Sequence, residues 1–136
     1  MHNGIAWDDS YLIGCDEVDE QHKQLFASLN ELVEHCQKGS AAQVVGKTLQ
    51  FVAEYVEHHF NSEEKVQVSS NYPGYAAHKQ MHDDFRKTVG VIKGQFAENG
   101  SVQDLQKILV KVVVKWIVTH ICNEDKKIGA YLKTIP

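Results

Sequence analysis

The sequence predicts an all-α protein, an up-down-up-down four-helix bundle with an N-terminal arm and a short C-terminal helix. Apolar residues recur in alternating steps of three and four along four long stretches, which is the pattern of amphipathic helices. The chain has only 2 prolines. Its breaks are short: Gly39-Ser40, Asn71-Tyr72-Pro73-Gly74 and Asn99-Gly100-Ser101. Because loops this short join antiparallel neighbours, the four stretches are expected to form a bundle.

The breaks divide a single predicted domain, residues 1–136, into an arm, four long helices and a tail. The arm spans about 1–16, the helices about 17–38, 41–67, 75–98 and 102–121, and the tail helix about 124–132. The inward stripe of the first helix is Val18, His22, Leu25, Leu29, Leu32 and Cys36. That of the second is Val45, Leu49, Val52, Val56, His59 and Glu63. The third gives His78, His82, Phe85, Val89, Ile92 and Phe96. The fourth gives Val102, Leu105, Leu109, Val112, Trp116 and His120.

The composition is that of an ordinary globular protein, with 43% apolar and 24% charged residues. A net charge of -4 argues against nucleic acid or an anionic membrane as the partner. Cys15, Cys36 and Cys122 form no CxxC pair, which favours free thiols in a reducing compartment. The polar start does not resemble a signal peptide, and the most apolar stretch, 110–121, is too short to cross a bilayer. We therefore expect a cytoplasmic protein.

Polar residues interrupt the apolar stripes at particular heights in the bundle. They fall near the start of the first and third helices and near the end of the second and fourth. In an antiparallel bundle these positions lie at the same end, so six inward side chains share one layer. Asp125 follows in the turn just beyond and can reach the same place. The resulting set is His22, His59, Glu63, His78, His82, His120 and Asp125.

Burying so many imidazoles and carboxylates is costly unless something satisfies them, and a metal does so. His59/Glu63 and His78/His82 are i, i+4 pairs, so each pair can bind one centre from one helical face. Neighbouring His58 is rotated about 100° off the stripe. We interpret His58 and Glu64 as outer partners of the ligands or as solvated surface residues.

The ligand set exceeds what one zinc ion accepts, and no cysteine ligation is suggested. Two six-coordinate metals that share both carboxylates and one bridging solvent oxygen would leave one position open for a small ligand. Non-haem iron suits these nitrogen and oxygen ligands, and manganese fits the same count.

At these residues the chain resembles the hemerythrin family. The resemblance rests on W-D-D-S-Y…D-E-Q-H, H-F-N-S-E-E, Y-P-G-Y-A-A-H-K-Q-M-H and W-I-V-T-H-I-C-N-E-D-K-K, and it runs from Trp7 to Leu132. The arm and the Y-P-G turn are similar to the bacterial branch, the bacteriohemerythrins. The stretch that follows Glu63, from Val66 to Ser70, is more polar than the corresponding stretch expected in the hemerythrin family.

The resemblance implies two non-haem iron ions joined by a bridging oxo or hydroxo group. One iron would be held by His78, His82 and His120, and the other, which keeps the open position, by His22 and His59. Glu63 and Asp125 would bridge them. The family's apolar oxygen pocket would map onto Leu25, Phe60, Ile117 and Ile121, with Trp116 packing nearby.

The predicted function is therefore reversible binding of molecular oxygen for storage, delivery or sensing, with nitric oxide or small anions as further ligands. The alternative is a di-iron enzyme: an oxidase, a peroxidase or a nitric-oxide reductase. The Glu-x-x-His motif of ferritin-like oxidases occurs nowhere in the sequence. His78-Lys-Gln-Met-His82 also lacks the glutamate of a zinc protease. We predict a binding protein with no catalytic residues, and expect a monomer.

Overall fold

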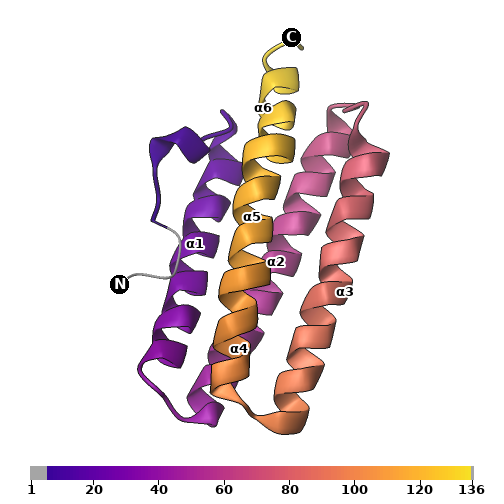
Figure 1. Cartoon of the computed structure of the whole chain (residues 1–136). Helices are drawn as coiled ribbons and strands as arrows, with labels where there is room; N and C mark the ends of the chain where they lie inside the picture. The colour runs from indigo at the N-terminus through magenta and orange to yellow at the C-terminus, as the bar shows by residue number, and fades with distance from the viewer. Residues whose placement is uncertain (1–5, 136) are drawn as a thin grey trace.

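The computed structural model describes residues 6–135, and the first five residues of the predicted arm lie outside that range. Three helices, α1 (Asp16–Gln37), α2 (Ala42–Ser69) and α3 (Tyr75–Asn99), precede a fourth that is built from several segments. Figure 1 shows the four running alternately up and down. α2 packs against α1 and α3, and the fourth helix also packs against both. The predicted four-helix bundle is confirmed, and residues 6–135 contain no strand.

The fourth helix is continuous, but it is not an α-helix throughout. It consists of α4 (Val102–Ile108), the π-helical η2 (Leu109–Val114), α5 (Lys115–His120), the π-helical η3 (Ile121–Asp125) and α6 (Lys126–Leu132). The short C-terminal helix is α6, and it follows a π turn where the sequence suggested a break. Asp125 accordingly lies in a helix and not in a loop turn.

The two π segments correct the predicted stripe of this helix. Val112 was expected inside, but it is 39% exposed, and Val113 is buried in its place. Buried residues recur in steps of four at Leu105, Leu109, Val113, Ile117, Ile121 and Asp125, and His120 is buried beside this row. In a regular α-helix each step of four drifts by about 40°. The wider π turns absorb this drift, so one face stays inward along the whole helix.

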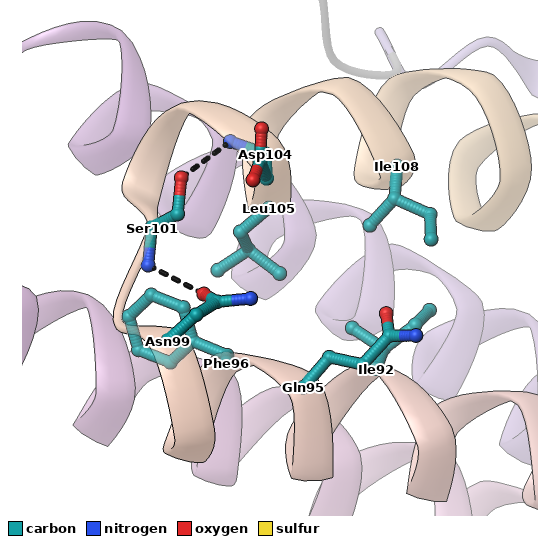
Figure 2. Close-up of a pocket in the computed structure, with 8 residues that line it drawn as sticks. All are labelled: Ile92, Gln95, Phe96, Asn99, Ser101, Asp104, Leu105 and Ile108. Atoms are coloured by element: carbon teal, nitrogen blue, oxygen red, sulfur yellow. Dashed lines mark hydrogen bonds between the residues drawn. The ribbon is translucent and has the colours of Figure 1, made fainter.

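The turn between α3 and α4 closes the end of the bundle away from the chain's C-terminus (Figure 1). Gly100 takes φ 61°, a left-handed conformation that suits glycine. The Asn99 side chain accepts a hydrogen bond from the Ser101 N–H at 2.7 Å, and Ser101 Oγ accepts one from the Asp104 N–H at 3.2 Å. Beside this turn a hollow of about 330 Å³ is lined by eight residues, none of which belongs to the predicted site (Figure 2).

The described part of the arm, residues 6–15, packs against the end of the bundle at which the chain's C-terminus lies (Figure 1). Trp7 and Tyr11 pack edge-on against Phe26 of α1, with ring centroids 5.4 and 5.1 Å away. The buried Asp19 carboxylate accepts hydrogen bonds from the backbone N–H groups of Ile13, at 2.7 Å, and Gly14, at 3.1 Å. These contacts fix the entry into α1, and with it the height of the metal-ligand candidates that follow.

The predicted stripes of α1 and α2 are buried at every position, whereas Val89 and Phe96 of α3 and Val102 of α4 are only half-buried. α2 also extends to Ser69, past the predicted end at 67, and buries Gln67 completely. Among the described residues no helix combines the length and apolar character needed to cross a membrane.

Candidate metal centre

All seven predicted ligands meet in one layer of the bundle. They come from α1, α2, α3, α5 and η3, and each is at most 6% exposed. Their nitrogen and oxygen atoms form two groups. One contains His78, His82 and His120, the other contains His22 and His59, and both include Glu63 and Asp125.

The carboxylate of Glu63 faces both groups at once. Its Oε1 atom lies 2.7 Å from Nε2 of His78 and 3.2 Å from Nε2 of His82. Its Oε2 atom lies 3.3 Å from Nε2 of His59. One oxygen is thus directed to each group, as a carboxylate that bridges two metals requires.

The carboxylate of Asp125 divides in the same way. Oδ1 lies 3.1 Å from the Nε2 atoms of both His78 and His120, and Oδ2 lies 3.1 Å from Nε2 of His22. His120 and Asp125 are five residues apart, a spacing that would separate them by about 140° on a regular α-helix. The π turn η3 brings them onto one face.

The imidazoles point their Nε2 atoms at one another inside each group. His22 and His59 approach to 3.0 Å, and His78 and His120 approach to 2.9 Å. Several buried atoms nevertheless have no hydrogen-bond partner: both oxygens of Glu63, Oδ1 of Asp125 and Nε2 of His82. Converging lone pairs with too few protons between them are what a metal ion satisfies. The donor set therefore fits two metal ions.

Without metal, the layer balances charge between imidazoles and carboxylates. Burial disfavours the charged form of Glu63, and so does the nearby Asp125, but the contacts with His59, His78 and His82 outweigh both and hold the pKa of Glu63 far below its usual range. The pKa of Asp125 is likewise lowered, mainly by His120, His22 and His78 against the effect of burial.

The histidines show the reverse shift. Burial alone would lower the pKa of His78, yet Asp125 and Glu63 raise it to about 9. The pKa of His59 is also raised, because Glu63 and Asp125 outweigh its burial. The metal-free layer thus holds protons at neutral pH, and metal binding would displace them.

Outer groups orient two of the histidines through Nδ1. His59 Nδ1 lies 2.8 Å from Oε1 of Gln21, and His82 Nδ1 lies 2.8 Å from Oε2 of Glu64. Arg86 in turn lies 3.0 Å from that Glu64 oxygen. The role of Gln21 was missed from the sequence, because a glutamine beside a stripe carries no signal of its own.

Glu64, interpreted above as an outer partner or a solvated residue, lies at hydrogen-bond distance from a predicted ligand. His58 is exposed and contacts Tyr55, with ring centroids 5.9 Å apart. It lies in neither ligand group.

An apolar cavity of about 10 Å³ adjoins the layer. That is room for one very small molecule. All five predicted pocket residues line it: Leu25, Phe60, Trp116, Ile117 and Ile121. Val56 and Phe85 line it as well. The sequence predicted both of them as buried residues of the apolar stripes, but it gave no sign that they border a pocket.

Two aromatic rings lie flat against histidines of the three-histidine group. Phe60 stacks on His82 with centroids 3.8 Å apart and planes at 5°, and Trp116 stacks on His120 at 4.3 Å and 11°. These rings keep the imidazoles from rotating and shield that group from water.

A helical bundle with two histidine groups that share two carboxylates, beside an apolar cavity, is a protein of the dinuclear non-haem metal class. The comparisons with known proteins narrow this class. The family model of the hemerythrin HHE cation binding domain matches residues 14–132. The chain belongs to the hemerythrin family, whose domain binds oxygen at a di-iron centre.

Individual relatives agree with this assignment. A bacteriohemerythrin of Stenotrophomonas maltophilia is 29% identical over 129 residues, covering 95% of this chain and 82% of the relative. A hemerythrin-like protein of Naegleria gruberi is 32% identical over 127 residues, covering 89% of this chain and 87% of the relative. A wild-type hemerythrin crystal structure matches with a TM-score of 0.83 and 29% identity, over 94% of this chain and 97% of that one.

Proposed function

We propose that this chain binds molecular oxygen reversibly at a di-iron centre held by the seven converging residues. His78, His82 and His120 would hold one iron, His22 and His59 would hold the other, and Glu63 and Asp125 would bridge them. The observation that carries the proposal is the division of each carboxylate, with one oxygen toward each histidine group.

The two-histidine group is where oxygen would bind. It offers one protein nitrogen fewer than the other group, so a metal held there would keep a free position. Both histidines of this group, His22 and His59, line the apolar cavity, whereas only His120 of the other group does. A ligand bound at that free position would therefore lie beside the cavity. When bound, the two ferrous ions supply the electrons that oxygen binding requires.

The chain's own residues would hold the oxygen and keep water out. The wall residues of the cavity are apolar, and its only titratable residues are predicted metal ligands: His22, His59, His120 and Asp125. No further acid or base in the described chain faces the cavity to deliver a proton that would split the O–O bond. This favours reversible binding over oxidase, peroxidase or nitric-oxide reductase activity.

Oxygen cycling of the iron-loaded protein tests the proposal. The protein would be reduced without oxygen, exposed to oxygen, then purged, with the visible spectrum recorded at each stage. We expect the same spectra over repeated cycles, with about two irons per chain by elemental analysis. A single irreversible turnover would instead support the enzyme.

A further inference from the structure

One predicted ligand lacks the outer partner that others have. Nδ1 of His22 is buried and has no hydrogen bond, whereas His59 and His82 lie 2.8 Å from the side chains of Gln21 and Glu64. With Nε2 of His22 turned to the metal layer, Nδ1 carries the ring proton. Leaving a buried N–H group without a hydrogen-bond acceptor costs free energy, so we expect an acceptor beside Nδ1 of His22.

A second unpaired polar group lies on the neighbouring helix. Gln67 is fully buried, and neither Nε2 nor Oε1 of its carboxamide has a partner. No other side-chain amide in residues 6–135 is buried without one. Gln67 lies four residues beyond Glu63, so it continues the inward stripe of α2 by one turn.

The two groups lie at neighbouring heights on adjacent helices. α1 and α2 pack against each other, and Nε2 of His22 lies 3.0 Å from Nε2 of His59 and 3.9 Å from Oε2 of Glu63. Gln67 is therefore one helical turn from the level of His22, and no direct hydrogen bond joins them. Proteins commonly place an ordered water between buried polar groups separated in this way.

We propose that a buried water molecule links the Gln67 carboxamide to Nδ1–H of His22, so that Gln67 is a positioning residue for this ligand. The water accepts a hydrogen bond from Nδ1 and donates one to Oε1 of Gln67. His22 is then fixed in tautomer and ring orientation, as His59 is by Gln21 and His82 by Glu64. Gln67 lies in the polar stretch that departs from the family pattern. The positioning role of Gln67 rests on the proposed function, because it requires a metal bound to His22. The presence of the water does not depend on that function.

Crystal structures of the metal-free and iron-loaded protein test the water directly. We expect one ordered water within hydrogen-bond distance of both Nδ1 of His22 and the Gln67 amide, in both forms. A direct bond from either group to another protein atom, or a dry gap between them, would overturn the proposal. If the protein binds no iron, the proposed function fails, and the metal-free crystals still decide whether the water is present.

The positioning role is tested with Gln67→Met, which keeps the side-chain length and removes the amide. The matched control is Gln43→Met, at an exposed position on the same helix. We expect Gln67→Met to weaken the binding of one of two irons by about 10–100-fold. The visible bands of the azide complex should shift as well, while the thermal midpoint of the metal-free protein does not fall. Gln43→Met should match the unmodified protein in all three measurements.

Unchanged iron affinity and unchanged azide bands in Gln67→Met would show that Gln67 only fills space, and would overturn the positioning role. If the thermal midpoint of metal-free Gln67→Met falls, the variant is less stable for reasons other than metal binding. The iron-loaded crystals of the unmodified protein then decide whether a water joins Gln67 to His22, because they require no substitution.

Discussion

His120 and Asp125 are separated by five residues of one helix, yet Nε2 of His120 lies 3.1 Å from Oδ1 of Asp125. The π turn η3 produces this contact, since it places residues five apart on the same face. π turns inside α-helices occur frequently at functional sites. Here the turn brings a second carboxylate, the proposed bridge Asp125, onto the same face of the helix as the proposed ligand His120.

Asp125→Asn should remove most of the bound iron while the helix is retained. The amide keeps the shape of the side chain but loses the charge and one metal-binding oxygen. We expect iron content to fall from about two per chain to about one or fewer, measured by elemental analysis. Glu124→Gln, at the adjacent position that faces Lys127, should keep full loading. Full loading in Asp125→Asn would mean that this residue is not a bridge.

Glu64→Gln should weaken iron binding at the three-histidine group. The carboxylate that accepts the Nδ1 proton of His82 becomes a neutral amide, which lowers the basicity of the imidazole. We expect affinity to drop by about 10–100-fold in anaerobic Fe(II) titrations. Glu57→Gln also removes a partner of Arg86 but has no contact with His82, so it serves as the control. Equal affinities for the two variants would assign Glu64 to the surface network alone.

Ile117→Asn should shorten the lifetime of the oxygen-dependent visible absorption in air. Ile117 is 3% exposed and lines the apolar cavity, so an amide there admits water beside the predicted open position. Iron content should stay unchanged, since Ile117 is no ligand. Thr119→Asn, on the exposed side of the same helix, should decay like the unmodified protein. Equal decay rates for both variants would show that Ile117 is ordinary core.

Gly129→Ala should destabilise the fold by about 1–3 kcal/mol or more. A Cβ atom at Gly129 would overlap the carbonyl oxygen of Ile13, where the arm crosses α6. At Gly94, within α3, an added Cβ meets no atom within 4 Å. Gly94→Ala should therefore stabilise the protein by up to about 1 kcal/mol through helix propensity. Chemical unfolding of both variants measures the contrast, and similar stabilities would rule out the arm contact.

The metal-free protein should lose stability as the pH rises from 6.5 to about 9. The pKa of His78 is 6.5 in an ordinary environment and about 9 in the fold, because Asp125 and Glu63 outweigh its burial. Its protonation therefore stabilises the fold fully below pH 6.5, and this contribution disappears as the pH passes about 9. Thermal midpoints followed by circular dichroism measure the loss. In the iron-loaded protein His78 is held unprotonated, so the same pH range should show no such decline.

The sequence by itself determined the bundle and the heights of its polar residues. Apolar periodicity is a local property of a helix, and short loops force antiparallel neighbours, so positions along the chain convert directly into levels in the bundle. The sequence pattern alone therefore predicts that His22, Glu63 and His82 lie in one layer.

The tertiary structure alone decided the register of the fourth helix and the atoms that each ligand faces. Local periodicity assumes one helical pitch, but packing against α1 and α3 is compatible with two π turns, which bury Val113 instead of Val112 and turn Asp125 inward. Gln21 and Glu64 likewise lie off the periodic stripes, so periodicity gave no sign of which histidine each contacts. A polar side chain becomes an outer partner only through the neighbour that a second helix brings to it, and that distance is set by packing between helices and not by sequence within one.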